Sequence, residues 1–206
     1  MSLRQPSPAT IGRVKAILFV VSLFPLVRLV AGASTDALGT NPLELITRST
    51  GTWTLVFLCI TLALTPARKL SGWHWLARYR RMFGLFAFFY AACHFTTFVW
   101  FDHFFDVAAI WKDVLKRPFV TVGFAALLLL VPLAITSTNG MMRRLGARRW
   151  QALHRSVHLI AILGVLHYWW LVKRDLTQPA LYALVVVTLL GVRLYWRHLG
   201  RKAAAI

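Results

Sequence analysis

Residues 150–171, WQALHRSVHLIAILGVLHYWWL, decide the fold class of this chain. The stretch is long and apolar enough to cross a bilayer, because about 20 helical residues span the hydrocarbon core. It nevertheless carries three histidines, His154, His158 and His167. Ionisable side chains are costly in lipid, so their presence in a membrane helix indicates a functional role.

The composition of the whole chain is that of an integral membrane protein. Of its 206 residues, 58% are hydrophobic and only 15% are charged, well below the roughly 25% that is usual in soluble domains. A net charge of +18 would suggest nucleic acid as a partner in a soluble protein. Here the basic residues cluster between apolar runs, where they set membrane topology. A nucleic-acid partner is therefore not expected, whereas contact with membrane lipid is expected. Cys59 and Cys93 both lie inside apolar runs, so no disulfide framework is implied.

The hydropathy pattern predicts an all-α fold, a bundle of six membrane helices in a single transmembrane domain. Pro66 is expected to close the second helix, whereas Pro25 and Pro132 lie within spans and are expected to kink them. The sequence Ala31-Gly32-Ala33 also resembles a signal-peptidase site, but Arg28 interrupts the apolar run and favours an uncleaved helix. The predicted spans are residues 11–33, 51–66, 81–101, 118–137, 150–171 and 179–197.

The charges predict the orientation of this bundle. The amino-terminal segment, the second and fourth loops and the tail contain basic residues and no acid. Basic loops stay in the cytoplasm, so both termini of this multi-pass protein are expected there. All loops are short, and any chemistry must take place in the membrane or on partners. The acids all lie in the first, third and fifth loops: Asp36, Glu44, Asp102, Asp106, Asp113 and Asp175.

The third loop contains a second kind of helix signal. Between residues 104 and 115 the apolar side chains recur at helical spacing, interrupted by Asp106, Lys112 and Asp113. This pattern predicts an amphipathic helix lying in the outer interface of the membrane. A membrane anchor is favoured over a docking surface for a partner.

A second histidine is expected at the level of His167. His94 lies 13 residues beyond Arg81, and His167 lies 12 residues beyond Arg155, on helices that run in the same direction. The two imidazoles should therefore be level in the outer half of the bilayer. Such a pair is typical of bis-histidine heme ligation. A proton relay and a purely structural pair are the alternatives.

The inner end of the fifth span offers a less complete site. His154 lies at the cytoplasmic boundary, and Arg80 and Arg81 occupy the matching level of the third span. Either a second heme has an unlike partner there or only one heme is bound. His158 lies about 40° from His154 around the helix, so the two share a face. His158 could therefore replace His154 as a heme ligand or assist it. His154 and His167 differ by about 220° around an ideal helix, and a distortion near Gly164 is invoked to bring them to one side.

The remaining candidates are weaker. His74, His103 and His198 lie in polar, basic or interfacial surroundings and are interpreted as solvated or interfacial side chains. Arg28 suits a heme propionate, because a guanidinium gives two parallel hydrogen bonds to a carboxylate. Snorkelling to the interface explains Arg28 nearly as well.

Four segments together resemble a known family. They are RSTGTWTLVFLCITLALTP (48–66), RYRRMFGLFAFFYAACHFTTF (78–98), KRPFVTVGF (116–124) and LAITSTNGMMRRLGARRWQALHRSVHLIAILGVLHYWWLVK (133–173). Their order and spacing are similar to those of the MsrQ, or YedZ, family of heme-binding membrane subunits of periplasmic protein-methionine-sulfoxide reductase systems. That family belongs to the ferric-reductase-like transmembrane group.

The resemblance implies a b-type cytochrome of the bacterial inner membrane that takes electrons from the quinone pool or from a cytoplasmic flavin reductase. It would pass them to a periplasmic molybdopterin-containing catalytic subunit of the MsrP type, which repairs oxidised methionines. The family's histidines correspond to His94, His154 and His167, whereas His158 departs from the pattern. The resemblance also implies flavin mononucleotide (FMN), for which the sequence has no local signature.

Two other classes of function compete with an electron-transfer subunit. A heme-free transporter or scaffold would use the histidines for proton relay or packing. A self-contained ferric reductase would need a cytoplasmic dinucleotide-binding domain, and the chain has no G-x-G-x-x-G turn after a strand. The chain is thus expected to be a subunit of an oxidoreductase complex rather than its catalytic subunit.

Overall fold

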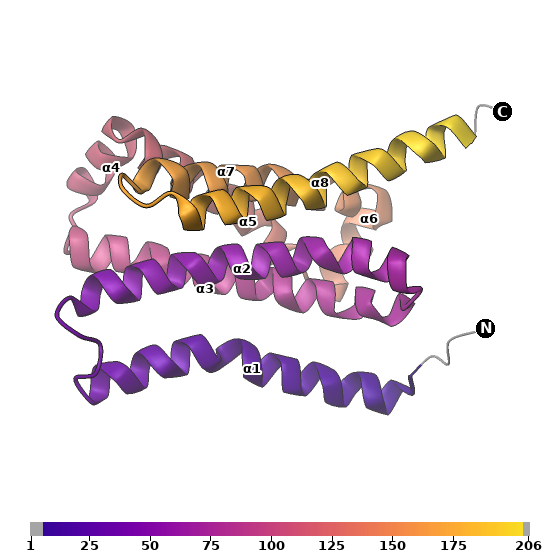
Figure 1. Cartoon of the computed structure of the whole chain (residues 1–206), viewed down its shortest axis with the longest axis horizontal. Coiled ribbons are helices and arrows are strands. Elements are labelled where there is room, and N and C mark those ends of the chain that lie inside the picture. The colour runs from indigo at the N-terminus through magenta and orange to yellow at the C-terminus, as the bar shows by residue number, and fades with distance from the viewer. Residues whose placement is uncertain (1–5, 204–206) are drawn as a thin grey trace.

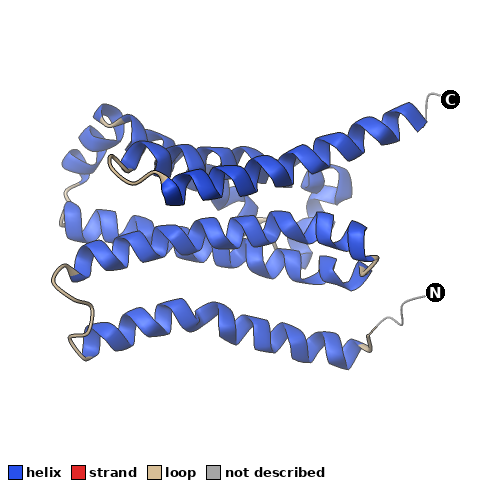
Figure 2. Ribbon diagram, in the orientation of Figure 1, coloured by secondary structure: helices blue, strands red, loops and turns tan. Residues whose placement is uncertain are grey.

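The computed structural model describes residues 6–203, the side chains of 200–203 excepted, and every regular element in this range is helical (Figure 2). The all-α prediction is confirmed for this part of the chain. The elements are α1 (Pro8–Ser34), α2 (Pro42–Ser71), the 3-10 helix η1 (His74–Tyr79), α3 (Arg80–Thr97), the π-helix η2 (Phe98–Asp102), α4 (Val107–Lys116), α5 (Pro118–Ile135), α6 (Asn139–His154), α7 (Val157–Leu171) and α8 (Thr177–Ala203).

Local sequence signals set several helix ends. Asn41 caps α2 by accepting a hydrogen bond from the Glu44 amide at 3.2 Å, and its own side-chain amide donates to the Glu44 carboxylate at 2.8 Å. The first bond satisfies one of the backbone donors that a helix start leaves free, and the second holds the two side chains together. Gly72 ends α2 with a φ of 71°, a left-handed conformation that glycine adopts at no steric cost.

Five of the described helices are long and apolar enough to cross a membrane: α1, α2, the continuous α3 region from His74 to Asp102, α5 and α8. The fifth predicted span, residues 150–171, is not among them, because its helix is shorter than expected. Helix α7 has 15 residues, fewer than the roughly 20 that usually span the hydrocarbon core. The long helices lie side by side along one direction (Figure 1).

The two ends of this bundle differ in charge. The basic end holds the start of α1, η1, α6 and the end of α8, on the right in Figure 1, and its connections contain no acid. The mixed-charge end, on the left, holds the α1–α2 connection, α4 and the α7–α8 connection. The segregation of charge seen along the sequence is thus also a segregation in space.

The predicted span 150–171 is wrong as a single helix. Its first five residues end α6, and α7 begins at Val157. At the break the backbone tightens, since the Ser156 amide donates to Leu153 O at 3.0 Å and the His158 amide donates to Arg155 O at 3.1 Å, three residues back instead of four. Hydropathy does not register this change, because the apolar composition continues across it.

Pro66 does not close α2, contrary to prediction, and the helix continues to Ser71. A proline in a helix leaves the carbonyl four residues earlier without its usual donor, here that of Leu62. The guanidinium of Arg193 on α8 donates to Leu62 O. A neighbouring helix therefore satisfies the freed carbonyl, which is how membrane helices tolerate internal proline.

Two tyrosines attach α1 to the rest of the bundle. Tyr79 donates its hydroxyl to Ile11 O at 3.2 Å. Tyr90 donates to Ser22 O at 2.8 Å and accepts from the Leu26 amide at 3.3 Å, so its hydroxyl is inserted into the hydrogen-bond ladder of α1 beside Pro25. An inserted side chain together with a proline accounts for a bend in the helix, and α1 curves along its length in Figure 1.

The centre of the bundle is the α2–α3 pair, whose contact is aromatic. Phe57 of α2 packs on Phe83, Phe86 and Tyr90 of α3 at centroid distances of 6.1, 5.3 and 5.4 Å. All four side chains are buried. Stacked aromatic rings bury large areas in fixed relative orientations, so this pair is a rigid frame for side chains at either end.

Candidate functional site

His94 of α3 and His167 of α7 lie beside each other towards the mixed-charge end. Their ring centroids are 6.1 Å apart and the ring planes meet at 75°. Equal depth on two helices, counted from the basic residues at the helix starts, predicted this meeting. The structure adds the distance and the near-perpendicular arrangement of the rings.

Each ring is held through its Nδ1 atom by a backbone carbonyl of another helix. His94 Nδ1 lies 2.9 Å from Thr47 O of α2, and His167 Nδ1 lies 2.7 Å from Phe119 O of α5. A carbonyl oxygen only accepts, so Nδ1 must carry the proton in both rings. Each Nε2 then keeps its lone pair, the state in which a neutral imidazole binds a metal.

Two glycines make room for these rings. A Cβ at Gly123 of α5 would lie 2.7 Å from His167 Nδ1, and one at Gly51 of α2 would lie 3.1 Å from His94 Cε1. The first distance is a clash and the second is a tight contact. Small residues let membrane helices approach closely, and here they admit an imidazole between helices.

The donor set suits a heme iron better than a bare metal ion. Within the described residues no group of three or more histidine, cysteine or acidic side chains is placed to hold a metal, whereas a zinc site needs three or four protein ligands. A heme supplies four ligands itself and needs only axial ones. Imidazole nitrogens bind metals at about 2 Å, so an iron between two rings sets their centres roughly 6 Å apart, as observed here.

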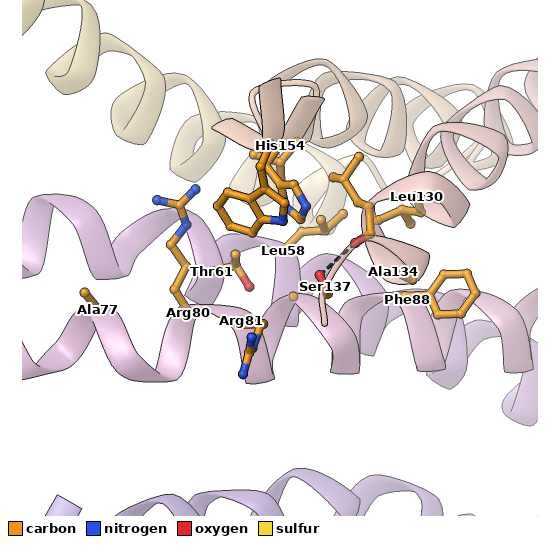
Figure 3. Close-up of a pocket in the computed structure, with 14 residues that line it drawn as sticks. Leu58, Thr61, Ala77, Arg80, Arg81, Phe88, Leu130, Ala134, Ser137 and His154 are labelled. Carbon is orange, nitrogen blue, oxygen red and sulfur yellow. Dashed lines mark hydrogen bonds between the residues drawn. The ribbon is translucent and has the colours of Figure 1, made fainter. Parts of the chain in front are cut away.

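His154 lies at the basic end beside a cavity of about 240 Å³ (Figure 3). Its Nε2 is 3.1 Å from the hydroxyl of Thr136, and that hydroxyl donates to Pro132 O at 2.6 Å. Because the Thr136 hydroxyl already donates its proton to Pro132 O, Nε2 of His154 must be the donor in the contact with Thr136. The ring also stacks on Trp150 at a centroid distance of 3.9 Å. His154 therefore has its proton on the opposite nitrogen from His94 and His167.

The cavity combines an apolar floor with two arginines. Leu58, Leu130 and Val157 contribute to the floor. Arg80 and Arg81 leave α3 in opposite directions (Figure 3), and Arg81 donates to Asn139 Oδ1 at 2.6 Å. Among the residues lining this cavity there is no second histidine, cysteine or methionine. Arg80 and Arg81 line it instead, at the position on α3 that the sequence placed level with His154.

His158 does not share the surroundings of His154, contrary to prediction. Its Nε2 accepts a hydrogen bond from Arg193 Nη1 at 2.9 Å, so its ring faces α8 while His154 faces α5. The break at residues 155–156 changes the helical register between the two histidines. Arg193 thereby joins α2, α7 and α8 through Leu62 O and His158, and its Nε is buried without a partner in the described structure.

The other predicted positions lie away from the His94–His167 pair. Arg28, His74 and His198 are exposed, which fits snorkelling for Arg28 and solvation for the two histidines. His103 is different, because its side chain is only 11% exposed and its Nε2 lies 3.2 Å from Asp113 Oδ2. His103 is therefore not a solvated side chain, since Asp113 of α4 and Phe98 lie against it. The contact with Asp113 is close but not aligned as a hydrogen bond. The interfacial alternative stays a prediction.

Several site residues were not predicted from the sequence. Thr47 and Phe119 act through backbone carbonyls, which no side-chain pattern reveals. Gly51, Gly123 and Arg193 had weak signals in the sequence, namely a glycine within an apolar span and an arginine near the end of one. Only the packing of the helices shows what each of them contacts.

Comparison with known proteins shows the family of this chain. The family model described as ferric reductase like transmembrane component matches residues 50–165. The protein-methionine-sulfoxide reductase heme-binding subunit MsrQ of Herminiimonas arsenicoxydans is 61% identical, covering 93% of this chain and 88% of that protein. Those of Ralstonia nicotianae and Rhodospirillum rubrum are 51% and 54% identical, covering 97% and 89% of this chain and 93% and 88% of their own lengths. The chain therefore belongs to the MsrQ family of the ferric-reductase-like transmembrane group.

Proposed function

We propose that this protein is a membrane subunit that binds b-type heme and transfers electrons, and that His94 and His167 would hold one heme. The observation that carries the proposal is the pair of rings 6.1 Å apart. Each ring donates its Nδ1 proton to a backbone carbonyl, which leaves the lone pair on Nε2. The names of the relatives, which describe heme-binding subunits, support it.

The chain's own residues explain what kind of chemistry suits this site. A heme held there supplies one-electron transfer between the ferric and ferrous states. If His94 and His167 both held it, no position would stay open for oxygen or a substrate. The Thr47 and Phe119 carbonyls fix the orientation of the rings and increase the basicity of Nε2, as second-shell partners of metal-bound histidines do.

The cavity beside His154 is our candidate place for a second heme. His154 would have to turn away from Thr136 to present Nε2, and the cavity supplies no second nitrogen or sulfur ligand. Arg80 is the cation suited to a propionate carboxylate there, rather than the exposed Arg28. The structure thus supports one symmetric site and one unlike site.

The partners follow from family membership and the charge pattern. Relatives are named as subunits of a protein-methionine-sulfoxide reductase, and we infer that this chain delivers electrons to such a periplasmic catalytic subunit. The donor is the quinone pool or a cytoplasmic flavin reductase, and FMN remains an expectation of the family resemblance. The His94–His167 pair lies towards the mixed-charge end, which the positive-inside rule assigns to the periplasm.

A spectroscopic experiment tests the function. The purified protein should give a pyridine hemochrome spectrum of b-type heme and a low-spin EPR signal. Because the imidazole planes meet at 75°, that signal should be strongly anisotropic. A heme-free preparation from cells with ample heme would overturn the proposal.

A second experiment tests orientation. A reporter fused after Lys202 should stay in the cytoplasm, and one inserted near Asp106 should be exported. The result also tests whether α7 crosses the membrane as the fifth of six spans, because α7 lies between these two positions in the chain. Export of both reporters would show that α7 does not cross. Export of the carboxyl-terminal fusion with retention of the one near Asp106 would reverse the assignment of the two ends.

A proton relay through the same pair is less well supported. Both Nδ1 protons point at backbone carbonyls, and a carbonyl does not pass a proton onward. These hydrogen bonds therefore fix the positions of the two Nε2 lone pairs and provide no onward path for a proton.

A further inference from the structure

Tryptophans mark two levels along the bundle. Tryptophan concentrates at membrane–water interfaces, where its amphipathic ring is stable. Of the nine tryptophans in the chain, only Trp53 lies well inside a long helix. Trp73, Trp75, Trp150 and Trp196 belong to the basic end, and Trp100, Trp111, Trp169 and Trp170 belong to the mixed-charge end.

Helix α4 lies at the second of these levels and has an exposed apolar stripe. Val107, Trp111 and Leu115 follow one another at four-residue spacing and are 75%, 56% and 66% exposed. The opposite face packs on the protein, where Val114 is 4% exposed and its carbonyl accepts from the Thr121 hydroxyl of α5. The stripe is thus held outward by contacts on the other side of the helix.

The turn before α4 is strained in a way that exposes two more aromatic rings. Phe104 and Phe105 have φ angles of 47° and 66°, in the left-handed region that bulky residues avoid. Their amides donate to Trp100 O and Val99 O at 3.1 and 3.0 Å, the end of a helix where glycine is usual. Their side chains are 80% and 61% exposed. The fold keeps two phenylalanines in positions that favour glycine and directs both away from the core.

We propose that residues 104–115 bind the phospholipid surface, with Phe104, Phe105 and Trp111 inserted at the boundary between headgroups and acyl chains. The level of the tryptophan belt supports lipid over a protein partner, because this segment shares it with Trp169 and Trp170 of α7. Lys112 and Lys116 each follow a residue of the stripe by one position and are exposed, so their amines reach phosphates beside the inserted face. This surface is independent of the heme proposal.

Site-directed spin labels test the insertion in the full chain. In a background with Cys59→Ala and Cys93→Ala, labels at Phe104→Cys and Trp111→Cys are compared with matched labels at Asp106→Cys and Lys112→Cys. Val20→Cys on exposed α1 is the control for a lipid-facing position. In vesicles of phosphatidylethanolamine and phosphatidylglycerol, the first two labels should collide more with oxygen than with a polar nickel complex, and the matched labels should show the reverse ratio.

Equal nickel accessibility at all four positions would overturn the proposal. So would labels at 104 and 111 that become protected only when a soluble protein is added, since that result assigns the stripe to protein docking. The unmodified chain provides an independent measurement. A phospholipid with a photoreactive group high on its acyl chain should label the 104–115 peptide more than the 35–41 connection at the same end, and equal labelling would contradict insertion.

Discussion

The His94–His167 pair and His154 use the same side chain for different purposes, and hydrogen bonding makes the difference. Both members of the pair face a carbonyl through Nδ1, whereas His154 faces a hydroxyl through Nε2. A carbonyl forces the proton onto Nδ1, and a hydroxyl already committed to another acceptor forces it onto Nε2. The availability of a ligand atom is therefore decided by the residue behind the imidazole.

The two sites also differ in what surrounds them. Each ring of the pair packs closely against a glycine of a neighbouring helix. His154 adjoins an open cavity with Arg80 and a stacked tryptophan. The first arrangement is rigid and symmetric, and the second leaves room for a ligand of unlike chemistry.

The largest effect is expected from removing either member of the pair. His94→Ala and His167→Ala should each abolish the strongly anisotropic low-spin EPR signal, because the iron loses one of two axial ligands. The double variant should be little worse than either single one, the non-additivity of residues that act as a unit. A His94→Ala protein with an unaltered low-spin spectrum and full activity would refute the pairing.

Filling the space behind the rings should have the next largest effect. Gly123→Ala places a methyl group 2.7 Å from His167 Nδ1, whereas Gly51→Ala approaches His94 no closer than 3.1 Å. Overpacking costs about 1–3 kcal/mol, so Gly123→Ala should shift the EPR signal and lower heme content more than Gly51→Ala. Gly191→Ala is the control, since its added Cβ meets nothing within 4 Å. Equal effects of all three substitutions would show that the glycines do not position the rings.

Arg193 should matter for stability rather than for the pair. Arg193→Met leaves Leu62 O without its donor and removes the partner of His158, and an unsatisfied buried polar group costs about 1–3 kcal/mol. The melting temperature should fall while the EPR signal of the pair persists.

A double-mutant cycle isolates the cause. Pro66→Ala restores a backbone donor for Leu62 O, so it should offset part of the Arg193→Met loss. Strict additivity in melting temperature would mean that the freed carbonyl is not what Arg193 stabilises.

The smallest effect on the pair is expected from the histidines of the basic end. His154→Ala should leave the anisotropic signal intact and remove only a second spectral component, if a second heme is bound. His158→Ala should be milder in heme content, because its Nε2 is occupied by Arg193. If His158→Ala removed all of the heme and His154→Ala left the heme content unchanged, the roles assigned to these two histidines would be reversed.

Much of the fold was predictable because it rests on properties that are summed along the chain. Hydropathy identified the membrane class and the approximate positions of the helices, and the distribution of basic residues separated the two ends. Counting residues from the basic helix starts placed His94 and His167 at one level, where their rings meet. These inferences hold because rise per residue and transfer free energy depend little on which neighbour a helix has.

Tertiary structure decided what depends on rotation and contact. The break at residues 155–156 divides an uninterrupted apolar run, and it sends His154 towards Thr136 and His158 towards Arg193. The continuation of α2 past Pro66 requires a guanidinium from a helix 131 positions further along the chain. The sequence predicted that His94 and His167 would lie level with each other on two apolar helices, and their rings do lie side by side. Only the packed helices determined which nitrogen of each ring is free, because that depends on a hydrogen-bond partner distant in sequence and close in space.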